Sequence, residues 1–277
     1  METKYLNVND KIKLAYYSEF IPNSKSGVII VHGLAEHKGR YDEFMDKLLE
    51  NNISVFAIDL RGHGESLGKR GDITRFASYV KDLYLFISDI KERHPELKLI
   101  LFGHSLGGLI SSSYVAKHDG IDLLILSSPV LSAPMKAKFL VFVPYRIMGF
   151  IRLKKPQSEQ ILKLKNTKID PLACHTFTFR LLGNMFQDGV KYITKRFSII
   201  NIPILMLGGR LDPLVNSGKF ASILEKMGSE NKTLKIYDNV KHRIVQSDSK
   251  DEAISDILEW INRNIQVEEK CNGKNEY

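Results

Sequence analysis

The sequence predicts an α/β protein with a mostly parallel β-sheet and helices on both faces. Three features predict it: short apolar, β-branched runs typical of buried parallel strands, longer segments with one apolar helical face between them, and loops rich in glycine and charge after the runs. Strands and helices that alternate in this way form a parallel sheet covered on both sides. With 277 residues, the chain is long enough for one such domain and an insertion.

The strands are predicted from the apolar runs. Runs such as GVIIVH at 27–32 predict strands at 27–32, 53–58, 99–102, 123–126, 203–207 and 233–237. Helices are predicted between and after them, at 41–51, 76–93, 106–117, 217–227 and 251–265. The first of these illustrates the criterion, because Phe44, Leu48 and Leu49 share one helical face.

Residues 129–199 interrupt the alternation. This segment is rich in lysine, lacks clear strands and carries thirteen Lys and Arg against three Asp and Glu. The excess positive charge of the chain, whose net charge is +8, is therefore concentrated there. We predict that residues 129–199 form a helical cap, or lid, inserted into a core made of residues 1–128 and 200–277.

Composition excludes several classes of protein. A content of 43% hydrophobic and 26% charged residues is typical of a folded chain rather than a disordered one. The two cysteines, Cys174 and Cys271, offer no disulfide framework. The amino terminus has no secretory apolar segment, and the longest apolar run, 139–145, is far shorter than the ~20 residues that cross a bilayer. We expect a cytoplasmic protein with, at most, peripheral contact to a membrane.

The segment GHSLG at 103–107 matches G-x-S-x-G, a sharp turn that lifts a serine hydroxyl clear of a sheet. The pattern alone is short, and its alternative is an ordinary strand-to-helix turn. A predicted strand stands directly before it and a helix of small residues directly after it, and this context favours a nucleophile elbow. We therefore predict an α/β-hydrolase fold with Ser105 as the nucleophile.

A serine hydroxyl needs a base to take its proton, and in this fold the partners follow in the order Ser, acid, His. His242 follows the last predicted strand, whereas His118 ends a helix and His175 lies in the predicted cap, so His242 is predicted as the base. Asp212 lies in a turn directly after a predicted strand and is predicted as the acid. Asp238, close to His242 in sequence, is the alternative acid.

The negative oxygen of a tetrahedral intermediate needs backbone N–H donors. Leu106 is predicted to supply one, because it follows the nucleophile, and Leu34, in the loop after the first predicted strand, is the candidate for the other. His32 is expected to brace this loop. The histidines and cysteines have no zinc-ligand spacing, and the glycine loop at 59–66 lacks a dinucleotide or Walker pattern, so we expect no metal and no cofactor.

Four segments of the chain carry a resemblance to a known family: HGLAEHKGRY at 32–41, GHSLGG at 103–108, DPLAC at 170–174 and KTLKIY at 232–237. They resemble the monoglyceride lipase family, including its poxvirus members, and the resemblance extends along almost the whole chain. It implies hydrolysis of monoacylglycerols to glycerol and fatty acid, with Ser105, Asp212 and His242 as the triad.

The resemblance also implies a binding site for the glycerol hydroxyls at Glu36 and Arg40; the alternative for this pair is an ion pair within the loop. Cys174 matches a family cysteine near the pocket wall, or is a buried structural thiol. Thr167 and Val245 replace a tyrosine and a second histidine of the mammalian enzymes. A hydroxyl site that loses partners loses discrimination, so the reaction type is better defined than the head group.

Within the predicted cap, apolar runs at 139–143 and 147–151 are flanked by basic residues: Lys136, Lys138, Arg146, Arg152, Lys154 and Lys155. A basic amphipathic segment binds lipid surfaces through apolar burial and through attraction to anionic lipids. We hypothesise that the cap docks on a bilayer and feeds a tunnel to Ser105. The alternative is that these side chains only line the tunnel and roof the core.

Other functions stay open at this point. A lysophospholipase or a general carboxylesterase needs the same triad with a different head-group pocket. A non-catalytic lipid-binding protein on this fold is expected to have lost a triad member, and none is lost. The basic segment does not predict a nucleic-acid partner, because apolar residues dominate it and it carries no recognised binding motif.

Overall fold

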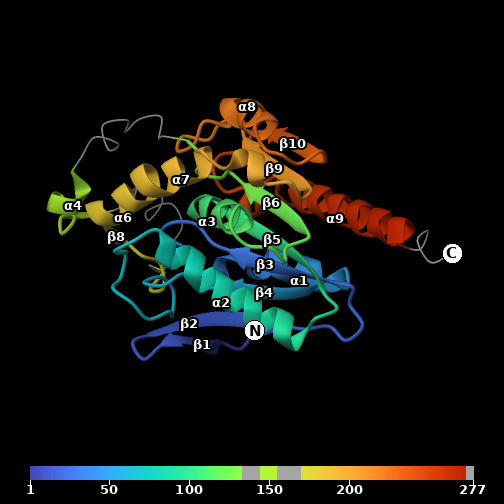
Figure 1. The fold of residues 1–277 in the computed structure, drawn as a ribbon, viewed down its shortest axis with the longest axis horizontal. Coiled ribbons are helices and arrows are strands. Elements are labelled where there is room, and N and C mark those ends of the chain that lie inside the picture. Colours follow the sequence, from blue (N-terminus) through green and yellow to red (C-terminus); the bar gives the residue numbers. More distant parts are fainter. Residues whose placement is uncertain (133–143, 155–169, 273–277) are drawn as a thin grey trace.

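The computed structural model describes residues 1–132, 144–154 and 170–272. Its centre is an eight-stranded sheet in the order β1-β2-β4-β3-β5-β6-β9-β10 (Figure 1). The strands are β1 Lys4–Asn9, β2 Ile12–Glu19, β3 Ser26–Val31, β4 Ser54–Ile58, β5 Lys98–His104, β6 Leu123–Ser127, β9 Ile204–Gly209 and β10 Lys232–Tyr237. Strands β3 to β6, β9 and β10 run parallel, which confirms the predicted fold class.

The amino-terminal strands β1 and β2 were not predicted. They pair with each other antiparallel, and β2 also pairs antiparallel with β4, so they extend the sheet at one edge. Most residues of β1 are exposed or half-buried. An edge strand of this kind has no uninterrupted apolar run, so it lacks the pattern by which the buried parallel strands were recognised.

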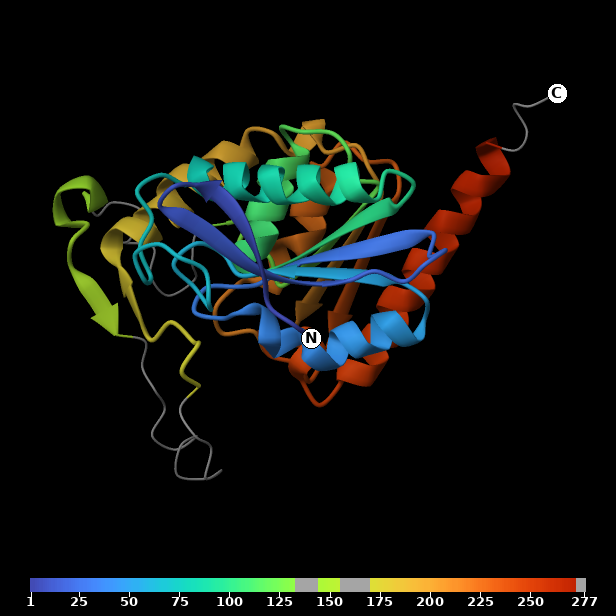
Figure 2. The same cartoon turned by 90° about the horizontal axis from the view of Figure 1, so that it is seen from below.

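Helices cover both faces of the sheet. One face carries α2 (Ala77–Arg93), α3 (Leu106–Val115) and α8 (Phe220–Glu225), and the other carries α1 (Asp42–Glu50) and α9 (Lys250–Asn272). Figure 2 shows α2 above the sheet and α1 and α9 below it. Because successive strand side chains point to opposite faces, β3 contributes to both cores. Ile29 and Val31 pack in the first core, and Val28 and Ile30 pack in the second.

The described part of residues 129–199 lies at one end of the molecule, on the left of Figure 1. It contains α4 (Tyr145–Met148), α6 (Phe179–Gly183) and α7 (Val190–Thr194), with a π-helical turn η3 (Asn184–Gly189) between the last two and a 3-10 turn η4 (Phe197–Ile199) after them. It also contains a short antiparallel pair of strands, β7 (Arg152–Lys154) and β8 (Thr176–Thr178), which the sequence did not predict. Strands of three residues are too short to leave a periodic pattern.

Several contacts fix this segment to the sheet domain, among them those of Asp72 and Asn184. Thr178 and Arg180 both donate hydrogen bonds to the buried carboxylate of Asp72. The amide of Asn184 accepts a bond from the backbone N–H of Phe76, at the start of α2. Among the described helices, none combines the length and the apolar content that crossing a bilayer requires.

Candidate active site

Ser105 lies in the sharp turn between β5 and α3. Its φ is 54° and its ψ is −113°, a left-handed conformation that is uncommon for a residue with a side chain and is found at functional sites. Two backbone hydrogen bonds hold the turn: the N–H of Ser105 donates to Ser127 at 3.0 Å, and the carbonyl of Ser105 accepts from Val130 at 3.1 Å. The strained turn is thus fixed from the neighbouring strand β6 and the loop that follows it.

Gly107 permits the close approach that this turn requires. A Cβ atom on Gly107 would lie 2.0 Å from the carbonyl oxygen of Val31 and 2.7 Å from that of His32, so no larger residue fits without moving α3 away from β3. A Cβ atom on Gly103 would lie 2.7 Å from the carbonyl oxygen of Gly107. The glycines on either side of Ser105 therefore let strand and helix pack in contact.

Ser105, His242 and Asp212 form a continuous hydrogen-bonded chain. The Nε2 atom of His242 lies 2.9 Å from Oγ of Ser105, and its Nδ1 atom lies 2.7 Å from Oδ2 of Asp212. Ser105 follows β5, Asp212 follows β9 and His242 follows β10. Because these strands are parallel, their carboxyl ends meet at one edge of the sheet, and residues far apart in the chain become neighbours there.

The environment of Asp212 favours its ionised form. Its side chain is fully buried, and burial alone raises the pKa of a carboxyl group. Asp212 accepts a hydrogen bond from His242 and two more from the backbone N–H groups of Leu214 and Val215, at 2.8 and 3.1 Å. Together these bonds lower the pKa of Asp212 by more than burial raises it. An ionised Asp212 accepts the Nδ1–H of His242, which leaves the Nε2 lone pair directed at Ser105.

The alternative residues lie elsewhere. Asp238, with a side chain that is 72% exposed, pairs with Arg210. His118 packs beside Tyr84, and His175 contacts the carbonyl oxygen of Asp170 through Nε2. Asp212 is thus the carboxylate that the structure brings to His242.

The loop after β3 lies against Ser105. A Cβ atom on Gly33 would lie 3.2 Å from Cβ of Ser105, and the backbone turns sharply here, with φ of 65° at Ala35. Both ring nitrogens of the buried His32 are used: Nδ1 contacts the carbonyl oxygen of Gly33 at 2.8 Å, and Nε2 accepts the N–H of Leu60 at 3.0 Å. His32 therefore braces the loop, as expected, in which Gly33 lies against Ser105.

Leu106 begins α3 directly after Ser105. The first N–H groups of an α-helix have no partner within the helix, so the N–H of Leu106 is free of the intrahelical pattern. Of the two predicted oxyanion donors, Leu106 thus begins α3 directly after Ser105, and Leu34 lies in the loop after β3, in which Gly33 approaches Ser105.

Glu36 and Arg40 do not pair with each other, contrary to the ion pair within the loop that we considered as the alternative. Glu36, only 2% exposed, pairs with Arg243, whose Nε lies 2.9 Å from Oε1. Arg40 donates to Asp170 from both Nε and a terminal nitrogen, at 3.1 and 2.7 Å. Arg243 was not singled out in the sequence, because a charged residue next to His242 has no signature of its own.

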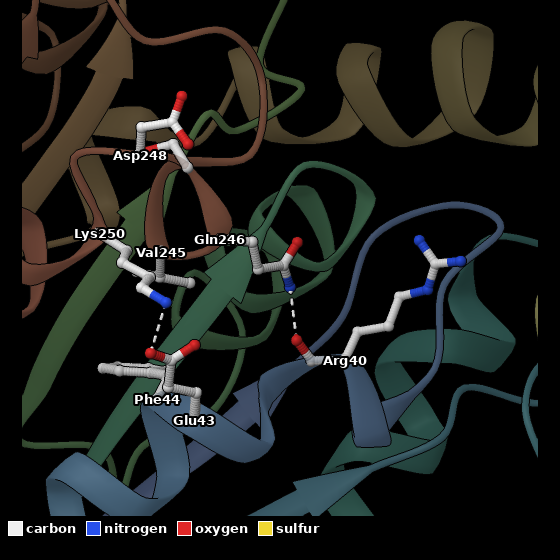
Figure 3. Close-up of a pocket in the computed structure, with 8 residues that line it drawn as sticks. Arg40, Glu43, Phe44, Val245, Gln246, Asp248 and Lys250 are labelled. Carbon is white, nitrogen blue, oxygen red and sulfur yellow. Dashed lines mark hydrogen bonds and ion pairs between the residues drawn. The ribbon is translucent and has the colours of Figure 1, made fainter. Parts of the chain in front are cut away.

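Two of the cavities among the described residues are not lined by Ser105, His242 or Asp212. The first, of about 370 Å³, lies between α1 and the loop after His242 and includes Val245 in its wall (Figure 3). Figure 3 shows the Arg40 side chain directed away from it. The second, of about 570 Å³, lies between the start of α2 and the helices α4 and α6. Thr167 and the predicted tunnel segment 139–143 lie outside the described residues.

The thiol of Cys174 is buried and donates to the carbonyl oxygen of Thr176 at 3.1 Å, which fits a structural thiol. In the part of the chain that the structure describes, no three His, Cys, Asp or Glu side chains gather where they could hold a metal ion.

Comparison with known proteins decides the family. Residues 22–249 match the Hydrolase_4 family, described as serine aminopeptidase, S33. The chain belongs to this family. This chain is 30% identical to mouse monoglyceride lipase over 257 residues, which are 87% of this chain and 84% of that protein. It is 29% identical to the monkeypox virus monoglyceride lipase homolog over 267 residues, 91% of this chain and 95% of the relative.

A solved structure of a monoacylglycerol lipase also resembles this chain. The structure of a Paleococcus ferrophilus monoacylglycerol lipase superimposes on this chain with a TM-score of 0.78 and 27% sequence identity. The match covers 91% of this chain and 99% of that one. The resemblance to monoglyceride lipases and the α/β-hydrolase fold, both predicted from the sequence, are therefore confirmed. The chain is a serine hydrolase.

Proposed function

We propose that this hydrolase cleaves the ester bond of monoacylglycerols, with Ser105 as nucleophile, His242 as general base and Asp212 as the acid that orients His242. The observation that carries the proposal is the hydrogen-bonded chain in which one imidazole reaches both Ser105 and Asp212. The names of the relatives, monoglyceride and monoacylglycerol lipases, supply the substrate class.

The reaction begins with acylation of Ser105. As Oγ attacks the acyl carbon, its proton passes to Nε2 of His242, and ionised Asp212 stabilises the imidazolium that forms. The N–H groups of Leu34 and Leu106 receive the negative charge on the former carbonyl oxygen. When the tetrahedral intermediate collapses, His242 returns the proton to the glycerol oxygen, which leaves.

Deacylation repeats these steps with water. His242 takes a proton from a water molecule, the hydroxide attacks the acyl carbon, and the released proton restores the Ser105 hydroxyl. Fatty acid leaves and the enzyme returns to its starting state. Neither half-reaction needs a metal ion or an organic cofactor for its atom balance.

We place the glycerol end of the substrate at the loop that carries Glu36 and Arg40. Of this pair, Arg40 keeps exposed surface, with 23% of its side chain accessible, and offers guanidinium N–H groups to hydroxyl oxygens. Glu36 is enclosed, and both of its oxygens already have partners, so it acts by shaping the loop.

Part of the cap region presents apolar side chains to solvent beside positive charge. Ile147 is 76% exposed and Phe150 is 78% exposed; Arg146 directly precedes Ile147, and Arg152 follows Phe150 by two residues. Apolar insertion and attraction to anionic lipids both favour contact with a bilayer. We propose that this face docks on the membrane where the lipid substrate resides. The free thiol of Cys174 supports action from the reducing cytoplasm.

Cosedimentation with vesicles tests the membrane contact. Wild-type protein is expected to bind anionic vesicles more than neutral ones, and salt is expected to reduce the difference. Phe150→Ser should weaken binding, whereas Tyr5→Ser, at a side chain that is 54% exposed on β1, should not. Equal binding by the two variants and the wild type would exclude this face as the contact.

A substrate panel tests the reaction. Monooleoylglycerol is expected to have the highest kcat/KM, ahead of lysophosphatidylcholine and of a short p-nitrophenyl ester. Faster turnover of lysophosphatidylcholine would identify a lysophospholipase instead, and preference for the short ester a general carboxylesterase. Absence of turnover with all three, from folded protein, would favour a non-catalytic lipid-binding function.

A further inference from the structure

The carboxylate of Glu36 joins the two ends of its own loop, residues 33–41, to the loop after β10. Its Oε2 atom accepts hydrogen bonds from the N–H of Gly33 at 3.3 Å and from the hydroxyl of Tyr41 at 2.9 Å. Its Oε1 atom pairs with Nε of Arg243 at 2.9 Å. One buried side chain thus connects the loop after β3, the start of α1 and the loop after β10.

The charge on Glu36 is retained in this buried place. Burial raises the pKa of the carboxyl group, but His104, Arg243 and the hydroxyl of Tyr41 together lower it to about 2. The ion pair with Arg243 is therefore fully formed at neutral pH.

Arg243 follows His242 directly in the chain, and its side chain is 42% exposed, so its charge belongs to the same loop as the imidazole that must become positive in each half-reaction. The other charged or titratable groups around His242 are Asp212, bonded to Nδ1, and His104, whose ring lies 4.9 Å away. Burial lowers the pKa of His104 to about 4, so His104 is neutral at pH 7. Lys241, on the other side of His242 in the chain, is exposed to solvent. Glu36 is consequently the group that offsets Arg243.

A second contact fixes the same two loops. The side-chain amide of Gln246 donates to the carbonyl oxygen of Arg40 at 2.9 Å (Figure 3). The loop of residues 242–247 is thus held to the loop of residues 33–41 at two points. One of these two points, Glu36, also bonds Gly33, which lies against Ser105.

We propose that the Glu36–Arg243 ion pair is a positioning pair. It fixes the loop of residues 242–247 against the loop of residues 33–41, and it neutralises the charge of Arg243, so that His242 can accept a proton. This inference rests on the proposed esterase function. It assigns to Glu36 a role in the turnover of every ester, not in the recognition of glycerol.

Steady-state kinetics of Glu36→Gln, with monooleoylglycerol and with a p-nitrophenyl ester that has no glycerol, tests the role. The pair acts through His242, so kcat should fall about tenfold or more on both substrates with little change in KM. Loss on monooleoylglycerol alone, through a raised KM, would overturn the proposal and make Glu36 a glycerol ligand. Unchanged kinetics on both would overturn it as well.

The pH dependence of kcat/KM gives a readout that a merely structural role would not move. In Glu36→Gln, uncompensated Arg243 opposes protonation of His242, so the acid limb should move to lower pH. In Arg243→Met, the unpaired negative charge of Glu36 favours protonation of His242, so the acid limb of the kcat/KM profile should move to higher pH. The double variant Glu36→Gln/Arg243→Met should restore the position of the limb but not kcat. Shifts in the same direction in both single variants would contradict the proposal.

Controls separate this proposal from folding and from the proposed function. The double variant buries no unpaired charge and is expected to fold, and Arg243→Lys, which keeps the charge, should recover part of kcat. Arg263→Met removes a comparable arginine from an exposed ion pair with Glu259 in α9 and should behave as wild type. Inactivity of wild-type protein on both esters would refute the esterase function itself, whereas an active wild type with unaffected variants would refute only the positioning pair.

Discussion

The Nε2 atom of His242 lies 2.9 Å from Oγ of Ser105, although 137 residues separate them in the chain. The contact depends on the parallel sheet, since β5 and β10 deliver their following loops to the same edge. It also depends on Asp212, which accepts the other side of the ring. Disturbing either the ring's orientation or the packing of the turn should therefore affect activity in distinct ways.

Asp212→Asn is expected to lower kcat by roughly 10⁴-fold, as the equivalent change does in a serine protease, because an amide stabilises the wrong histidine tautomer. The fold should persist, since Asn retains the oxygen that accepts the N–H groups of Leu214 and Val215. Ester turnover and a thermal melt of the same preparation measure the two effects. Asp238→Asn, at an exposed carboxylate, serves as the control, and a comparable loss there would reassign the acid.

Gly107→Ala is expected to destabilise the protein by about 3 kcal/mol or more, because the new Cβ would collide with backbone rather than with a movable side chain. Gly218→Ala is the matched control, since a Cβ there would meet only Oδ1 of Asn216, at 3.1 Å. Urea unfolding of the two variants provides the comparison. Equal free energies of unfolding would mean that α3 does not pack on β3 as described.

Glu36 should make stability depend on pH. Its pKa in the folded protein is about 2, against an ordinary value of 4.5, so the unfolded chain binds protons more readily and stability rises with pH. The contribution of roughly 3 kcal/mol is complete above the unfolded value and is lost as the pH falls towards 2. The difference in unfolding free energy between wild type and Glu36→Gln should narrow by about 1 kcal/mol from pH 6 to pH 3.5. A difference independent of pH would contradict an ionised Glu36.

The sequence predicted the parts of the fold that have a strong local pattern. The central strands are continuous apolar runs, and all six are found, from β3 to β10. The G-x-S-x-G turn and the order of the proposed triad residues likewise follow from local sequence and chain order. The antiparallel strands β1 and β2, and the three-residue strands β7 and β8, have no such pattern and were missed.

Long-range polar pairing was the part that sequence could not supply. Glu36 and Arg40 are four residues apart and of opposite charge, which suggested a pair, yet each finds its partner in a distant loop. The choice depends on which loops meet at the sheet edge, and that is settled by packing of the whole domain. The partnership of Glu36 with Arg243 is therefore visible only in three dimensions.

Labelling with a fluorophosphonate probe, which reacts only with an activated serine, is the most direct test of the account. Wild-type protein is expected to label rapidly, and Ser105→Ala to remain unlabelled while keeping the wild-type melting temperature. Labelling of Ser105→Ala at the wild-type rate would place the nucleophile at another residue and would contradict the central claim.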